Sequence, residues 1–366
     1  MKIGFSNLRN NLYIVLKPKF RKSIFRTFQN KFDTVNSCTK EIDCLTSSFY
    51  CYKNGEKSIP IYILKQIFQR CNVNNSKINK NISKIKTFSG IEIKIKLPIK
   101  SNSEFANLIG HLLADGHVDK SYRISYANKS EILINRFEQI VKNNFYYDIK
   151  AQKRLHLKSD TYEIRYPAII GSLLQSFGII QGNKTVIEFD IPKWIKNGNK
   201  DTKTSFLRAI FDDESWIRNK SITISFAKRR EEQKSLIRFL LSIRKLLEEF
   251  DIKTNRILKH GSYKGKVVLG FSITGYSNLY NFHKFIGFDS ERKRLQVLNE
   301  IKSYKRKVFR KGEGIELITK LLNGGKEIDI YTLSKKLGKH PETIKYHLKN
   351  LNHKRELKRG SPSLVK

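Results

Sequence analysis

The sequence predicts an α+β fold in which one unit of helices and strands occurs twice, followed by a small helical module. The main observation is an internal repeat, because residues 104–179 and residues 203–288 contain the same elements in the same order. A second observation is the change after about residue 305, where helical patterns replace strand patterns. An α+β unit that occurs twice implies a pseudo-twofold pair, so we expect two pseudo-symmetric units.

Each repeat is expected to begin with a helix of apolar and small residues, at 105–116 and at 205–215. A strand, an amphipathic helix, two further strands and a short apolar helix follow, with room for an extra strand after the first helix. The apolar stripe of the amphipathic helix is Ile132, Phe137, Ile140 and Val141 in one copy and Leu236, Leu240, Ile243 and Leu247 in the other. The expected strands are residues 123–127, 152–158 and 161–166, and residues 223–227, 254–260 and 265–274.

Along the chain we expect four regions. Residues 1–100 form a basic N-terminal region that is partly irregular, residues 101–200 and 201–305 form the two units, and residues 306–366 form the helical module. In the first region nothing is assigned before residue 55, residues 59–68 predict a short helix near Pro60, and residues 91–98 predict a strand. The four cysteines lack the paired spacing of zinc sites, so we expect reduced, unligated thiols.

The C-terminal module contains two short helical patterns, residues 330–338 and 340–351, separated by a turn glycine. Pro341 suits the first turn of the second helix. This spacing is typical of a helix-turn-helix, although a plain αα-hairpin has the same pattern. Charge favours DNA contacts from the second helix through Lys345, His347 and Lys349.

The charge of the chain predicts a polyanionic partner. Lys and Arg number 72 against 33 Asp and Glu, a formal net charge of +39 spread over the 366 residues. A bias toward AT-rich codons explains the abundance of Lys, Asn and Ile, but it does not explain why acidic residues are so few. We therefore expect nucleic acid as the partner. No stretch approaches the roughly 20 apolar residues of a membrane span, so we expect an intracellular protein, in cytoplasm, nucleoid or organelle matrix, with no membrane partner.

The two motif helices carry the predicted chemistry. Small residues, Gly110 and Ala209, would let these helices approach closely, and Asp115 and Glu214 occupy matching positions at their C-terminal ends. If the copies pair about the pseudo-dyad, the two carboxylates meet, and a divalent cation such as Mg²⁺ offsets their repulsion. Such a site suits phosphodiester hydrolysis. Taken singly, each acid also fits a solvated helix end.

The residues 108–116, Leu-Ile-Gly-His-Leu-Leu-Ala-Asp-Gly, look like the LAGLIDADG motif of homing endonucleases, and residues 207–215 resemble its second copy. The stretches 178–184 and 191–195 resemble the segment that precedes the second motif. The resemblance covers roughly residues 90–300. It implies a monomer of two αββαββα units, whose saddle-shaped antiparallel sheets lie in the DNA major groove. It also implies magnesium-dependent cleavage of both strands of a long site.

The resemblance also implies roles for particular residues. Asp115 and Glu214 would bind the metal, with the backbone carbonyls of Gly116 and Ser215 beside them, and Lys129 and Lys228 would be the basic residues of the two active sites. Two positions depart from the family pattern, because Ser215 replaces a glycine and Asp213 replaces a small residue. Side chains that could read bases from the sheets are Arg123, Ser125, Lys153, Arg154, Arg165, Thr223, Ser225 and Arg256.

Two other functions remain open. One is a DNA-binding regulator that combines a similar fold with a helix-turn-helix and has lost catalysis. The other is a maturase that binds intron RNA with the same fold. A self-splicing intein is not expected, since the chain starts with Met1 and ends in Leu364-Val365-Lys366.

Overall fold

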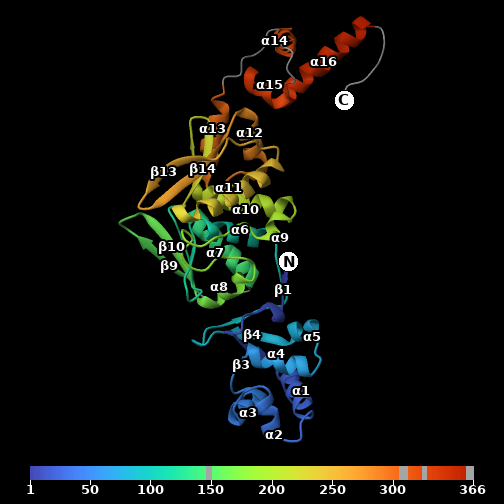
Figure 1. Ribbon diagram of the computed structural model, residues 1–366, viewed down its shortest axis with the longest axis vertical. Helices are drawn as coiled ribbons and strands as arrows, with labels where there is room; N and C mark the ends of the chain where they lie inside the picture. The colour runs from blue at the N-terminus through green and yellow to red at the C-terminus, as the bar shows by residue number, and fades with distance from the viewer. Residues whose placement is uncertain (146–150, 305–311, 324–327, 360–366) are drawn as a thin grey trace. The chain divides into compact units, whose positions relative to one another are not determined.

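A computed structural model describes residues 1–145, 151–304, 312–323 and 328–359. The chain divides into two compact units, Met1–Asp213 and Glu214–Lys366 (Figure 1). Across the described residues, no helix combines the length and the apolar character needed to cross a membrane. The bounds of the four regions expected from the sequence remain predictions.

The N-terminal part of the first unit is folded from its first residues, so the expectation of an irregular start is wrong. Apolar residues at helical spacing are buried, among them Phe20, Ile24 and Phe28 of α1. The helix expected at residues 59–68 is α4, which begins directly after Pro60. The elements are β1 (Lys2–Ile3), η1 (Phe5–Asn7), β2 (Tyr13–Leu16), α1 (Pro18–Gln29), α2 (Val35–Glu41), α3 (Thr46–Asn54), β3 (Ile59–Pro60), α4 (Ile61–Arg70), α5 (Asn75–Asn81), β4 (Ile82–Lys86), β5 (Glu92–Lys94) and β6 (Ile99–Lys100). An antiparallel sheet has the order β3-β2-β4-β5, and β1 pairs with β6.

The first repeat has the predicted order, including the extra strand. It consists of α6 (Ser103–Leu113), β7 (His117–Val118), β8 (Ile124–Asn128), α7 (Glu131–Phe145), β9 (Gln152–His156), β10 (Thr161–Tyr166) and α8 (Ala168–Gln175). The strands form an antiparallel sheet in the order β7-β8-β10-β9. One detail of the expected stripe is wrong: Ile132 is 54% exposed, and Leu133 and Ile134 are buried in its place.

Helices α9 (Lys193–Lys196) and α10 (Lys200–Glu214) follow, and α10 packs on α6 through the predicted small residues. A Cβ atom added to Gly110 would lie 2.7 Å from the Cβ of Ala209 and 2.8 Å from the carbonyl oxygen of Phe206. The Asn107 side-chain amide of α6 also donates to the carbonyl oxygen of Ser205, at 3.2 Å. The two motif helices therefore touch backbone to backbone.

This contact makes Gly110→Ala a test of the helix pair. Alanine is the better helix former by about 1 kcal/mol, but its methyl group has no room here, and overpacking typically costs about 1–3 kcal/mol. We expect Gly110→Ala to lower the thermal midpoint measured by calorimetry. Gly261→Ala is the control, because a Cβ there meets no atom within 4 Å. Equal midpoints for the two variants would contradict the close approach.

The second unit contains the rest of the second repeat. Its elements are β11 (Ser215–Arg218), β12 (Ser221–Arg229), η2 (Arg230–Glu232), α11 (Gln233–Glu248), β13 (Leu258–Tyr263), β14 (Lys266–Thr274), α12 (Tyr276–Asn281), η3 (Phe282–Ile286) and α13 (Glu291–Lys302). The sheet order, β11-β12-β14-β13, repeats that of the first sheet, strand for strand. The α+β class with repeated αββαββα elements and antiparallel sheets is thus confirmed. All four predicted core residues of α11 are buried.

Three C-terminal helices belong to the same unit: α14 (Glu313–Leu322), α15 (Ile330–Leu337) and α16 (Pro341–Arg359). Ile318, Leu333 and Ile344 form their core. Gly338 has a φ of +61° and ends α15, as the turn glycine predicts. The hydroxyls of Ser277 on α12 and Ser334 on α15 lie 2.8 Å apart and are buried, so the helices contact the second repeat.

Candidate active site and nucleic-acid interface

The two predicted acids lie where the motif helices end. Asp115 follows the C-cap residue Ala114 of α6 and is exposed, whereas Glu214 is the last residue of α10 and is half-buried. Both positions agree with the sequence prediction for the helix ends. That the two carboxylates share a cation remains a prediction.

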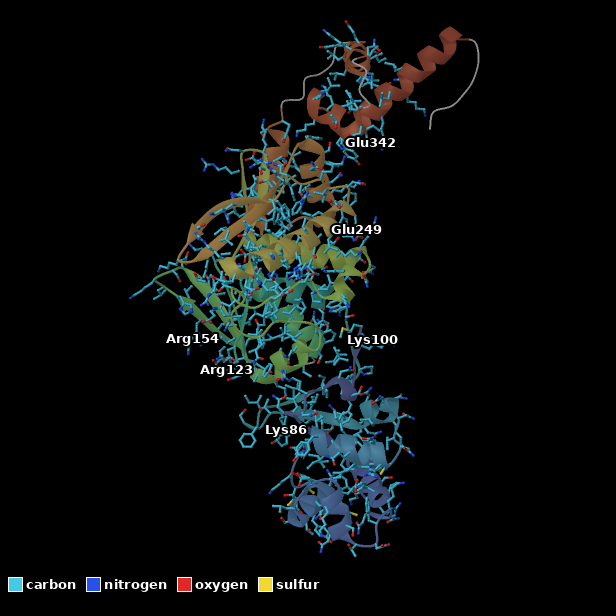
Figure 2. The ribbon with its side chains drawn as sticks, in the orientation of Figure 1. Lys86, Lys100, Arg123, Arg154, Glu249 and Glu342 are labelled. Atoms are coloured by element: carbon cyan, nitrogen blue, oxygen red, sulfur yellow. The ribbon has the colours of Figure 1, made fainter. Side chains whose placement is uncertain are left out.

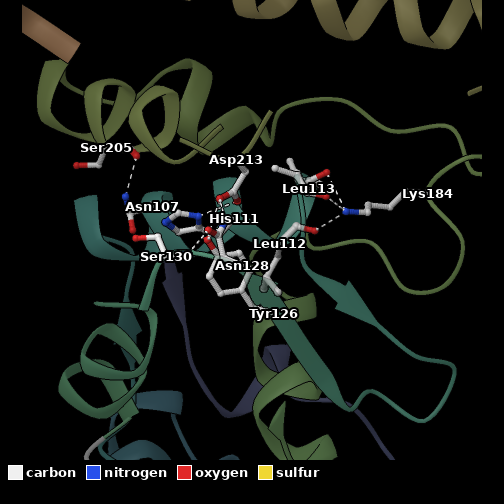
Figure 3. A network of polar contacts seen from close by, with 11 residues as sticks. Asn107, His111, Leu112, Leu113, Tyr126, Asn128, Ser130, Lys184, Ser205 and Asp213 are labelled. Atoms are coloured by element: carbon white, nitrogen blue, oxygen red, sulfur yellow. Dashed lines mark hydrogen bonds and ion pairs between the residues drawn. The ribbon is translucent and has the colours of Figure 1, made fainter. Parts of the chain in front are cut away.

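A lysine lies beside the helix end in each repeat, and the sequence analysis missed both. The ammonium group of Lys184 donates to the carbonyl oxygens of Leu112 (3.3 Å), Leu113 (3.2 Å) and Ala114, directly before Asp115 (Figure 3). The buried Lys293 donates to the carbonyl oxygen of Ser215 at 2.5 Å, directly after Glu214. A cation is favourable at a helix C-terminus, where carbonyl oxygens lack partners.

These lysines occupy matching places in the repeat. Lys184 lies six positions after Gly178, and Lys293 lies six positions after Gly287, the glycines that close the two copies. The equal spacing of the two lysines from these glycines is visible in the sequence when the two copies are compared past their closing helices. The structure thus places a positive charge at backbone carbonyls of residues adjacent in sequence to each motif acid.

The two lysines predicted from the sequence differ in their position and burial. Lys129 directly follows β8 and is exposed. Lys228 lies inside β12, not past it, and is 1% exposed, with its ammonium group 3.2 Å from the hydroxyl of Ser235 on α11. Since Ile124 matches Ile224, the residue that matches Lys228 is Asn128. Lys129 and Lys228 are therefore not a symmetric pair.

Asp213, the extra acid beside Glu214, is held in a buried network (Figure 3). Its carboxylate accepts hydrogen bonds from the Tyr126 hydroxyl (2.8 Å) and the Asn128 amide (3.2 Å), and its second oxygen lies 2.8 Å from Nδ1 of His111. The side chains of Asp213 and His111 are fully buried. Burial, and then the negative charge of Asp213, raise the pKa of Tyr126 well above its usual value, so its hydroxyl stays a donor. Asp213 thus joins the last turn of α10 to α6 and β8.

The other departure, Ser215, also has a local explanation. A Cβ at Gly116 would lie 2.7 Å from Cα of Leu112, because the chain turns sharply after α6. In the second copy, α10 runs directly into β11, which begins at Ser215. The tight turn that requires glycine is absent between these two elements, so serine is tolerated.

The outer face of the first sheet carries four of the eight predicted base-reading residues. Arg123, Ser125 and Arg165 line a hollow of about 700 Å³, together with His117 and Gln152, which the sequence analysis did not select. Arg154 is exposed on the neighbouring strand β9 (Figure 2). This face is hollowed and carries exposed arginines, as expected for a surface that contacts nucleic acid, although Glu92, Asp119 and several apolar residues also line the hollow.

The ion pairs of Glu163 lie on this surface, whereas that of Lys153 lies on the opposite side of the sheet. Glu163 bonds Arg165 (2.8 Å) and His156 (3.0 Å); burial opposes ionisation, but these partners outweigh it and hold the pKa of Glu163 below its usual value. Lys153 points the other way, because neighbouring strand residues face opposite sides. It contacts Glu138 of α7 at 2.6 Å and Asn135 at 2.8 Å. Lys153 therefore lies on the helix side of the sheet, contrary to the prediction.

The second sheet agrees only in part with the expected base-reading set. Ser225 is half-buried on β12, whereas Thr223 is 7% exposed and its hydroxyl lies 2.8 Å from that of Ser272. Arg256 lies before β13 and not on a strand, because that strand begins later than predicted. Trp216 of β11, missed in the sequence, is 45% exposed, with its ring 5.9 Å from that of His260.

On α16, Lys345 and Lys349 are exposed and His347 is half-buried. Lys345 forms an ion pair with Glu342, 2.9 Å away and one turn earlier. The exposed side of this helix thus carries two of the three predicted residues, Lys345 and Lys349.

The donors at the motif-helix ends suit a hard cation. Asp115 in one copy and Glu214 in the other offer carboxylate oxygens beside backbone carbonyls, the donors that Mg²⁺ prefers. Within the ranges that the structure describes, no three His, Cys, Asp or Glu side chains are grouped to hold a metal ion. A bound cation would therefore depend on water and phosphate oxygens as well, which is usual for Mg²⁺.

No family model matches the chain. Similar curated proteins include the replication factor C small subunit of Methanocaldococcus jannaschii, 31% identical over 207 residues, with 55% of this chain and 10% of the relative covered. The RNA polymerase subunit Rpo1N of the same organism is 26% identical over 255 residues (59% and 18% covered), and the tRNA-splicing ligase RtcB of Pyrococcus furiosus is 27% identical over 212 residues (52% and 21% covered). The chain thus spans about a tenth to a fifth of these relatives. Since their named activities differ, the shared segment brings none of them to this chain.

The similar solved structures include I-DmoI in complex with DNA and calcium, at 15% identity, with 50% of this chain and 88% of that chain covered and a TM-score of 0.37. I-WcaI bound to its DNA recognition sequence is 15% identical (54% and 86% covered, TM-score 0.35). The N-terminal LAGLIDADG domain of DUF199/WhiA is 17% identical (54% and 89% covered, TM-score 0.34). Each of these three similar structures covers about half of this chain.

Proposed function

We propose that the chain is a site-specific DNA endonuclease that hydrolyses phosphodiesters with a divalent metal ion. The observation that carries the proposal is the repeated helix end, where an acid, Asp115 or Glu214, lies next to backbone carbonyls that a lysine contacts. An acid alone fits a solvated helix end. An acid accompanied by a lysine in each of the two copies fits a pair of hydrolytic half-sites.

In this proposal Asp115 and Glu214 hold Mg²⁺, with the carbonyl groups of Gly116 and Ser215 beside them. The metal ion would lower the pKa of a water molecule and stabilise charge on the phosphate. Lys184 and Lys293 would place positive charge next to the same phosphates, where the transition state gains negative charge. Lys129 and Lys228 become secondary candidates, since Lys228 is buried against α11.

The DNA would lie along the outer faces of the sheets, with Arg123, Arg154 and Arg165 facing it. The formal net charge of +39 supports a long contact with phosphates. The pair α15 and α16 supports a helix-turn-helix role for the C-terminal helices, with Lys345 and Lys349 toward DNA. One chain carries both copies of the motif, so we propose that a monomer acts.

The decisive experiment is a cleavage assay on the two flanks of the gene's own insertion site, rejoined without the insert. With Mg²⁺ we expect a staggered double-strand cut at one position, and with EDTA we expect binding without a cut, because the metal ion serves the chemistry. Binding with no cut at any Mg²⁺ concentration would instead support a regulator, which the C-terminal helices favour. Preferential binding to the cognate intron RNA would support a maturase.

A further inference from the structure

Two short helices in the N-terminal part of the first unit are joined in a way that the sequence analysis did not anticipate. Helix α2 ends at Glu41 and α3 begins at Thr46, so residues 42–45 form the connection. Within it, Asp43 has a φ of +46°, the left-handed conformation that usually requires glycine. A connection of this length with one left-handed residue is typical of a helix-turn-helix.

The inner faces of the two helices are buried against a third. Cys38, Thr39, Ile42 and Phe49 are each at most 4% exposed. The Phe49 ring packs on Phe25 and Phe28 of α1, with ring centroids 5.3 and 6.5 Å apart. The three helices therefore form one small core, in which α1 supports the pair (Figure 1).

Polar contacts hold both ends of α3. At its start, the hydroxyl of Thr46 lies 3.4 Å from that of Thr39 and donates to the side chain of Asn36, at 3.2 Å. At its end, Arg21 of α1 donates to the carbonyl oxygens of Lys53 (3.3 Å) and Asn54 (2.9 Å). These contacts fix both ends of α3, and its remaining face is exposed to solvent.

That open face has the chemistry of a base-reading helix. Ser47 and Asn54 are exposed and Tyr50 is 43% exposed, at helical spacing on one side of α3. The helix itself contains no acidic residue, and the Asn54 amide donates to Glu56 just past the helix end, at 3.1 Å. Hydroxyl and amide groups can pair with base edges in the major groove. On the supporting helix α1, Lys19, Lys22 and Arg26 are exposed and suit the phosphates that flank a groove.

We infer that α2 and α3 form a helix-turn-helix and that α3 binds the major groove of double-stranded DNA. The inference rests on the proposed function and extends it, because it adds a base-reading element outside the repeated sheets. The recognition site would then extend beyond the base pairs that the sheets cover.

The test compares Tyr50→Glu with Tyr62→Glu in the full chain. Both tyrosines are 43% exposed and both belong to the N-terminal part, but Tyr62 lies on α4, outside the pair. Affinity is measured by fluorescence anisotropy with a fluorescein-labelled 60-base-pair DNA duplex of random sequence, and with a double-stranded RNA of the same length. Thermal unfolding verifies that each variant is folded, and Ser47→Glu serves as a second variant of the same face.

We expect Tyr50→Glu and Ser47→Glu to weaken DNA binding about tenfold, as a new negative charge meets phosphates and base edges. Tyr62→Glu should leave DNA affinity unchanged. RNA affinity should not change in any variant, because the A-form major groove is too narrow for a helix. Equal DNA affinities for Tyr50→Glu and Tyr62→Glu, or an equal loss on RNA, would overturn the inference and leave the proposed endonuclease intact. A wild-type chain that binds neither duplex would overturn both.

Discussion

Asp115→Asn and Glu214→Gln should each reduce cleavage at least about a hundredfold, because a metal ion contributes several kcal/mol to phosphodiester hydrolysis. Each change removes a negative charge from a motif-helix end and keeps the size of the side chain. Neither acid belongs to the buried core, since Asp115 is exposed and Glu214 is half-buried. The fold and the affinity for DNA should therefore survive. Cleavage of the rejoined insertion site and its binding by gel shift are measured in parallel.

The matched control is Glu131→Gln, at the exposed start of α7 in the same repeat. The substitution makes the same change of charge at a helix that carries no motif. The Glu131→Gln variant should therefore cut at the wild-type rate. Loss of DNA binding in step with loss of cutting would contradict the assignment of the two acids to the metal. Normal cutting by either variant would remove that acid from the site.

Asp213→Ala should lower the free energy of unfolding of the first unit by about 3 kcal/mol or more, because several polar groups lose their partner at about 1–3 kcal/mol for each buried one. Tyr126 and Asn128 would lose their shared acceptor, and His111 would lose its contact 2.8 Å away. Buried donors without acceptors are costly. Calorimetry on the purified variants measures the shift in unfolding temperature.

Asp201→Ala is the control, because Asp201 lies at the exposed start of the same helix α10. It should lower stability by less than about 1 kcal/mol, the effect of one acid near a helix N-terminus. The comparison also separates structure from catalysis. If Asp213→Ala stopped cleavage without changing the unfolding temperature, Asp213 would be a metal ligand and its structural role would be refuted.

Much of the fold follows from local patterns in the sequence. The α-β-α-β-β-α order of both copies was predictable because alternation with period two and apolar stripes with helical spacing are properties of short segments. The patterns left room for the extra strand after the first helix, and only the resemblance implied it. The helix ends at Asp115 and Glu214 and the glycine at the α6–α10 contact were predictable for the same reason, with the repeat as a second, independent signal.

What the sequence alone determined, then, is the order of the elements, their repetition and the positions of the two acids. Only the tertiary structure decided which basic groups stand beside those acids, since Lys184 and Lys293 reach their helix ends from positions about 70 to 80 residues later in the chain. It also decided that Asp213 is buried in a polar network and that the first 55 residues fold into helices and short strands. The physical reason is that periodicity records which face of an element is apolar, whereas hydrogen bonds and close contacts between distant segments depend on how those faces are brought together.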